Sequence, residues 1–317
     1  MTNKHPAPTP VPEAAATVTI GAVERDTGLS KDVLRMWERR YHFPVPQRDA
    51  HGERVYPPEQ VTKLRALKRL MDQGHRPGKI IGMTLEDLAA LNVDRASALR
   101  TRDRDVDEVL QLIGEHRLPE LRQRLNQLLL SKGLQRFVVE IVKPLNVEVG
   151  EAWSRGDLAI FEEHLYAEQI QSLLRYAIGS VQARGDPPRV LLTSFPTEQH
   201  CLGLLMAESM LVVEGVTCVA LGTETPLPDI VRAASAHQAD IVALSFSAAY
   251  PERQAVAGLR ELRALLPANT ALWVGGSGVS CHRRPLDGVV VVDDIERIAS
   301  LVADWRTEHR GNVHAAD

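Results

Sequence analysis

Cysteine, aromatic residues and long apolar runs are all scarce in this sequence. The three cysteines form no C-x-x-C pair, so the sequence implies neither a disulfide framework nor a zinc site, and it favours a reducing, cytoplasmic environment. The longest run without charge, 264–281, is interrupted by proline, asparagine and glycine and therefore does not predict a membrane-spanning helix. The N-terminal residues contain no apolar core of a signal peptide.

The composition is that of a folded protein with more than one domain. At 317 residues, with 44% hydrophobic and 25% charged residues, the chain is long enough for two domains or three small ones, each with its own core. The 37 basic residues are outnumbered by 41 acidic residues, which gives a net charge of −4. A surface for nucleic acid must therefore be confined to one part of the chain.

Changes in hydrophobic periodicity divide the chain into three folded segments. The first reads as short helices around a hairpin rich in Pro, Gly and Arg; the second has a helical period throughout; the third alternates short apolar runs with helical stretches. The predicted organisation is a disordered tail (1–16), a DNA-binding domain (17–91), a linker (92–105), a four-helix bundle (106–183), a doubly wound parallel α/β domain (186–306) and a second tail (307–317).

The third segment contains five runs typical of buried parallel strands. Ligands of doubly wound sheets bind beyond the carboxyl ends of the strands, so the residues that follow these runs are the candidates for chemistry. The runs are 189–193, 216–221, 240–245, 271–274 and 288–292.

The first segment is locally basic, with thirteen Lys or Arg against eight Asp or Glu in residues 17–80. Ser30 is a good N-cap for a helix that would enter a major groove, followed by a basic hairpin that would flank it. Charge alone leaves a second interpretation open, a helical domain that binds protein. The candidate DNA-binding residues are Lys31, Arg35, Trp37, Arg39, Arg40, Tyr41, Arg48, His51, Arg54 and Tyr56.

The order of these features is specific. The stretch that begins IGAVERDTGLSKDVLRMWERRYHFPVPQRDAHGERVY resembles the DNA-binding domain of MerR-type regulators over about sixty residues, with helix, LRxWERR, hairpin wing and G-x-R-x-Y in order. The resemblance implies a winged helix-turn-helix head that binds a two-fold operator of double-stranded DNA as a dimer. No heptads for a long coiled coil follow, which indicates another mode of assembly.

A histidine motif follows the first predicted strand of the α/β segment. Glu198, His200 and Gly203 form an acid-x-His-x-x-Gly pattern at the edge of the sheet where ligands bind. The imidazole Nε2 can bind a metal while the carboxylate holds the opposite ring nitrogen, which fixes the tautomer. Taken alone, the pattern also fits a loop histidine paired with a neighbouring carboxylate.

The motif resembles that of cobalamin-binding domains, in which the histidine replaces the cofactor's own benzimidazole as the lower ligand of cobalt. The resemblance implies that a Ser-containing strand end and a Gly-Gly pair accommodate the nucleotide tail. Ser245, Ser247, Gly275 and Gly276 stand at the corresponding positions, with Ser-x-Ser where the family usually has Ser-x-Leu. Singly, these residues are also typical of ordinary turns.

The helical segment resembles the cap that covers the upper face of cobalamin. Trp153, Glu163 and His164 give the W-x9-EH pattern of the CarH/LitR-type photoreceptors, which join a MerR head to this cap and a corrinoid domain. The resemblance implies that these three residues contact an adenosyl group. Without it, the Trp reads as a core residue and the Glu–His pair as a solvated helix face.

One position departs from the family type. A histidine that directly follows the Trp captures cobalt there after light removes the adenosyl group, whereas this chain has Ser154. Serine is a poor cobalt ligand, so we expect no stable bis-histidine photoproduct through that position.

These features predict a multidomain α and α/β protein that is not an enzyme: an adenosylcobalamin-dependent, light-responsive repressor, tetrameric in the dark. One alternative is a MerR-type regulator whose corrinoid-like domain senses another ligand or acts through protein contacts. A second is a component of a corrinoid methyltransferase or mutase, which the absence of a catalytic constellation disfavours.

Overall fold

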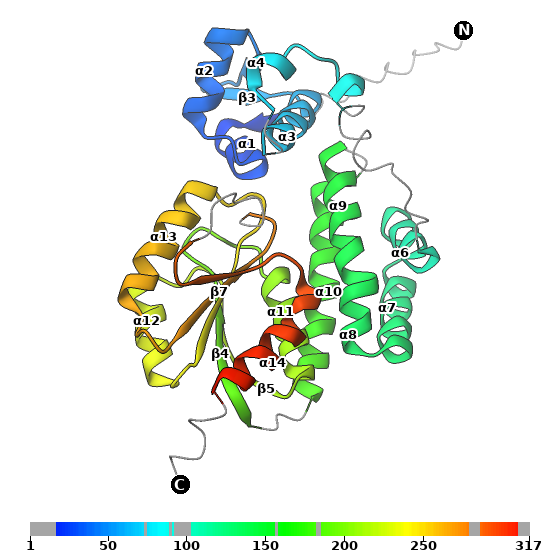
Figure 1. Cartoon of the computed structure of the whole chain (residues 1–317). Coiled ribbons are helices and arrows are strands. Elements are labelled where there is room, and N and C mark those ends of the chain that lie inside the picture. Colours follow the sequence, from blue (N-terminus) through cyan, green and yellow to red (C-terminus); the bar gives the residue numbers. More distant parts are fainter. Residues whose placement is uncertain are drawn as a thin grey trace, which may run out of the picture. The chain divides into compact units, whose positions relative to one another are not determined.

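The computed structural model describes residues 17–72, 75–88, 91, 103–155, 158–181, 185–278 and 286–309 (Figure 1). The chain divides into two compact units. One unit comprises the residues before 100 together with 154–156, and the other comprises the remainder. Within the described residues, no helix combines the length and the apolar character that a membrane crossing requires.

The N-terminal unit is a helical domain with a small antiparallel sheet of order β1-β3-β2. The Ser30 hydroxyl caps the second helix by accepting a hydrogen bond from the backbone N–H of Val33 at 3.3 Å, as expected from the sequence. The elements are β1 (Val18–Thr19), α1 (Ile20–Thr27), α2 (Lys31–Tyr41), β2 (Gln47–Arg48), β3 (Arg54–Tyr56), α3 (Pro58–Asp72) and α4 (Pro77–Ile80).

Two residues that the sequence predicted to contact DNA lie instead in the core of this unit. Trp37 and Tyr56 are 1% and 0% exposed and pack in one cluster with Leu34, Leu64 and Leu67. Because their rings are the largest apolar surfaces available to a small domain, they fill its centre. Neither offers surface to a ligand, so the prediction that they touch DNA is wrong.

The second unit begins with the predicted four-helix bundle. Its third helix is one continuous rod of three parts, in which a single turn of π-helix follows the first turn. The apolar stripe expected from the sequence, from Phe137 to Val149, is buried in the bundle core. The elements are α6 (Arg104–Gly114), α7 (Leu118–Lys132), α8 (Leu134–Phe137), η1 (Val138–Val142), α9 (Lys143–Arg155) and α10 (Ile160–Ser180).

The rest of this unit is a five-stranded parallel sheet of order β5-β4-β6-β7-β8 with helices on both faces (Figure 1). All five predicted strands are present, and the doubly wound topology is confirmed. The elements are β4 (Asp186–Thr193), α11 (Leu202–Val213), β5 (Val216–Gly222), α12 (Leu227–Ala236), β6 (Ile241–Ser245), α13 (Glu252–Leu265), β7 (Ala271–Gly275), β8 (Val289–Val292), η2 (Ile295–Arg297) and α14 (Ile298–His309).

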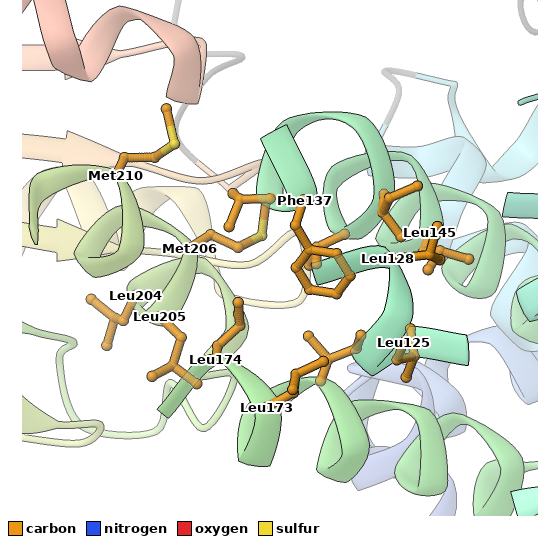
Figure 2. Close-up of a cluster of buried hydrophobic side chains, with 14 of the residues drawn as sticks. Leu125, Leu128, Phe137, Leu145, Leu173, Leu174, Leu204, Leu205, Met206 and Met210 are labelled. Carbon is orange, nitrogen blue, oxygen red and sulfur yellow. The ribbon is translucent and has the colours of Figure 1, made fainter. Parts of the chain in front are cut away.

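The bundle and the sheet share one hydrophobic core. Met206 of α11 points toward Phe137 of α8, and Leu204 and Leu205 of the same helix are buried in the same cluster as Leu174 of α10 (Figure 2). The helix α11 is apolar on nearly all sides because it lies between the sheet and the bundle. The bundle therefore packs on the sheet as part of one structural unit.

Candidate functional site

The strand order places the sequence-predicted residues at the switch point of the sheet. Strand β4 pairs with β5 on one side and with β6 on the other, so the connections that leave β4 and β6 diverge to opposite faces, and a crevice opens between them. The loop after β4 carries Glu198 and His200, and the residues at the end of β6 include Ser245 and Ser247. This edge is where ligands of such sheets bind.

Glu198 is a buried carboxylate with both oxygens fully engaged. It is 1% exposed. One oxygen accepts hydrogen bonds from the His200 backbone N–H (2.9 Å) and ring Nδ1 (2.7 Å), and the other from the Ser247 backbone N–H (2.7 Å) and hydroxyl (2.8 Å). Burial opposes ionisation, but these hydrogen bonds outweigh it, so the pKa of Glu198 is lowered.

The pairing fixes the chemistry of His200. An ionised carboxylate only accepts hydrogen bonds, so Nδ1 carries the proton and the lone pair of a neutral ring lies on Nε2. The hydrogen bond to Glu198 raises the pKa of His200 against the opposing effect of desolvation. The side chain is nevertheless 62% exposed. His200 is thus an oriented, accessible donor nitrogen, and the hydrogen bond expected from the sequence is present.

The loop that presents His200 rests on a serine that the sequence analysis did not single out. The Ser194 hydroxyl, fully buried, donates to the Glu198 carbonyl oxygen at 2.9 Å and accepts from the Glu224 N–H at 3.0 Å. It thereby ties the loop after β4 to the loop after β5. Its position directly after a buried strand, in a Thr-Ser pair, is the signal that could have identified it.

Two glycines permit close contacts that a side chain would block. A Cβ on Gly276, whose φ is +93°, would lie 2.2 Å from the Phe246 carbonyl oxygen. A Cβ on Gly203 would lie 2.3 Å from the Ser245 hydroxyl oxygen. Gly203 of α11 and Gly276, which follows β7, therefore let these segments approach the end of β6 more closely than side chains allow. Gly275 lies opposite Ser245 in the sheet register, so all four predicted Ser and Gly positions gather at this edge.

The predicted upper-face residues lie at neighbouring helix ends. Trp153, partly buried, is near the C-terminus of α9, and Glu163 and His164 are near the N-terminus of α10, with Glu163 Oε2 and His164 Nε2 3.6 Å apart. Burial raises the pKa of Glu163, and the charges of His164 and His200 counteract the shift. The Gln171 side chain of α10 donates to Cys201 Sγ at 2.7 Å, directly after His200, so α10 packs against the histidine loop. The side chain of Ser154 lies outside the described residues.

The head presents most of its predicted DNA-binding residues at the surface. Lys31, Arg35 and Arg39 are exposed and follow one face of α2 at intervals of four residues. Arg40, Arg48 and His51 are also exposed, whereas Tyr41 and Arg54 are partly buried. Arg54 pairs with Glu38 at 2.9 Å, and the Arg40 guanidinium lies 5.3 Å from the centre of the Tyr41 ring.

The ligand chemistry of the site suits a metal that brings its own equatorial donors. Within the described residues, no group of three or more His, Cys, Asp or Glu side chains is arranged to hold a bare metal ion. One oriented histidine at the ligand-binding edge of the sheet is instead what a corrinoid needs, because the macrocycle supplies four nitrogens and the protein adds an axial ligand. The residues present fit that group.

Comparisons with known families agree with this chemistry. The MerR HTH family regulatory protein domain matches residues 18–86. Two families described as B12 binding domain match residues 106–178 and 188–298. The chain is therefore a MerR-type regulator that carries cobalamin-binding domains.

Individual relatives extend the match to nearly the full length. The HTH-type transcriptional repressors CarH and CarA of Myxococcus xanthus are each 29% identical to this chain, over 88% and 91% of it and 95% and 96% of their own lengths. The monomethylamine corrinoid protein of Methanosarcina barkeri has a similar fold, with a TM-score of 0.52 and 13% identity over 63% of this chain and 98% of that protein. The chain is therefore similar to these two repressors over nearly its full length.

Proposed function

We propose that this protein is a transcriptional repressor that binds operator DNA in the dark with adenosylcobalamin bound and releases the DNA in light. The observation that carries the proposal is the Glu198-held His200 at the sheet edge, in a chain that also has a MerR head. The bound cofactor supplies a cobalt–carbon bond that light cleaves. The relatives' names as repressors support the direction of control.

The residues of the site divide into a lower and an upper set. Below, the Nε2 of His200 would bind the cobalt, Glu198 orients the ring, and Ser247 in turn holds Glu198. Ser245 and Gly276 stand at the sheet edge where the nucleotide tail would lie. Above, Trp153, Glu163 and His164 would contact the adenosyl group. A neutral imidazole is required for the lower contact, and the Glu198 hydrogen bond orients it without occupying Nε2.

DNA release is a change in avidity. The DNA-binding head is a separate unit, and a two-fold operator is bound by paired heads. We propose a tetramer in the dark, which presents paired heads and dissociates when the bundle moves. When both heads belong to one assembly, binding of the first head holds the second at a high effective concentration near the operator. Dissociation of the assembly removes this gain in affinity, so DNA is released although each head is unchanged.

The proposal is tested with the full chain loaded with adenosylcobalamin in the dark. We expect a coloured protein that retards operator DNA in a gel, and loss of both the bound spectrum and retardation in His200→Ala. The control is His237→Ala, which removes an exposed histidine at the end of α12. A chain that stays colourless with adenosylcobalamin, methylcobalamin and hydroxocobalamin overturns the proposal.

Ser154 indicates that the state formed after illumination differs from that of the family type. The family type has a histidine at this position, which binds cobalt after photolysis, and serine is a poor cobalt ligand. We expect the illuminated protein to show no bis-histidine cobalt spectrum that depends on residue 154. Such a spectrum, abolished by Ser154→Ala, would contradict this expectation.

A further inference from the structure

Three helices meet at a small polar junction inside the core shared by the bundle and the sheet. The Tyr166 hydroxyl donates to Asn146 Oδ1 at 2.6 Å, and Asn146 Nδ2 donates to Met206 Sδ at 3.2 Å. The three residues come from α10, α9 and α11. Tyr166 is 2% and Met206 is 7% exposed. None of the sequence motifs includes these residues.

The junction lies next to the upper and lower parts of the candidate site. Tyr166 is three residues after Glu163 on α10, close to one helical turn, and the Glu163 charge acts on the tyrosine hydroxyl. Asn146 is seven residues before Trp153 on α9, about two turns. Met206 is three residues after Gly203 on α11. The junction thus connects the helices that carry the upper residues to the helix that follows His200.

The hydrogen bonds of the junction fix the spacing of the helices, which apolar packing alone does not. The surrounding contacts, such as Leu145, Leu174 and Leu205, are non-directional, so they permit the bundle helices to slide and repack on α11. A buried hydroxyl and amide are costly to leave without partners. Their hydrogen bonds therefore favour one separation of α9 and α10 from α11.

We propose that the Tyr166–Asn146–Met206 junction is a specificity-determining element that sets the height of Trp153 and Glu163 above His200, so that corrinoids with a nucleoside-sized upper group bind better than those with a small one. This inference rests on the proposed function and assigns it a selectivity. Without the junction, the bundle is free to repack on α11, and no single height is favoured. Small upper ligands then bind as well as large ones.

The test compares two affinities in the full chain. Dissociation constants for adenosylcobalamin and hydroxocobalamin are measured in the dark for the wild type and for Tyr166→Phe, which removes only the hydroxyl. We expect the preference for adenosylcobalamin to fall about three- to tenfold, the scale of one buried hydrogen bond. The matched control is Tyr176→Phe, the same change at a 76% exposed tyrosine of α10.

A purely structural role predicts a different result. It would weaken the binding of both corrinoids by the same factor and lower the melting temperature. The ratio of the two affinities would then be unchanged, and that outcome overturns the inference. Met206→Leu provides a second variant of conserved volume, which decides the question if Tyr166→Phe does not fold. We also expect faster amide exchange in α9 and α10 of the cofactor-free Tyr166→Phe protein. If the wild type binds neither corrinoid, the proposed function fails together with the inference; if it binds both and only the ratio is unmoved, the inference alone fails.

Discussion

Replacement of Glu198 by glutamine tests the centre of the site with the smallest possible change of shape. Each carboxylate oxygen faces one backbone N–H, from His200 or from Ser247, and a backbone N–H cannot turn away. Glutamine has one oxygen and one NH2 group. In either orientation its NH2 group faces one of the two backbone N–H groups, which then lies buried without an acceptor.

The magnitude follows from this count. One hydrogen bond to a charged acceptor is lost and one buried donor is left unpaired, which together destabilise the fold by about 2–4 kcal/mol. For a unit of this size the melting temperature falls by about 4–16 °C. Where the NH2 group faces the His200 ring, Nδ1 must accept and Nε2 carries the proton, so the ring loses its free lone pair. Affinity for adenosylcobalamin is expected to fall about 10–100-fold.

Thermal unfolding of the cofactor-free chain and cobalamin titration by absorbance measure these two effects. The control is Glu261→Gln, which makes the same change at an exposed carboxylate of α13 and should leave both quantities within error. If Glu198→Gln changes stability by less than about 0.5 kcal/mol and leaves cobalamin affinity unaltered, then the four hydrogen bonds do not hold the histidine loop, and our account of the site is wrong.

Three further predictions concern single residues. Gly276→Ala should destabilise the α/β domain by more than about 1 kcal/mol in urea unfolding, because its φ of +93° and the nearby Phe246 carbonyl exclude a Cβ. Burial raises the pKa of Cys218 to about 12, so in a background in which Cys201 and Cys281 are both replaced by Ser it should resist alkylation at pH 8 until the protein unfolds. Hydrogen bonds from Arg136 and Lys132 lower the pKa of Glu140 to about 2, so its stabilising contribution is present above about pH 4.5 and is lost as the pH falls toward 2; the carboxyl titration followed by NMR should move upward by about one unit in Arg136→Gln.

The fold could be predicted from periodicity because each segment of this chain has a single clear period. The i, i+3, i+4 spacing from Phe137 to Val149 gave the buried helix, and runs such as 216–221 gave strands, because apolar faces must be covered in either structure. The π turn at Val138–Val142 was not predictable, since a one-residue insertion in a helix leaves hydrophobic spacing nearly unchanged. The core shared by the bundle and the sheet was not predictable either, because the pattern of one sequence shows that α11 is buried but not which elements cover it.

The candidate site was predictable in its motif residues and not in their supports. Glu198 and His200 are close in sequence, so their hydrogen bond could be inferred from local geometry, and it is present. The contact from Ser247 spans 49 positions and depends on the register of β4 with β6. In the head, Trp37 was assigned to DNA because it stands among arginines, but helical spacing turns it inward while its charged neighbours face outward.

Glu198 performs two tasks, and a matched pair of variants separates them. It folds the loop through two backbone N–H groups, and it orients a ligand through the His200 ring. His200→Ala removes the ring and its hydrogen bond but keeps the backbone N–H that donates to Glu198, so the loop should retain its conformation and lose less stability than in Glu198→Gln, while the cobalt ligand is lost. Glu198→Gln keeps the ring but leaves a backbone N–H of the loop unpaired. Complete loss of cobalamin binding with the smaller fall in melting temperature in the first variant, and weakened binding with the larger fall in the second, would therefore assign ligation to the imidazole and its positioning to the carboxylate.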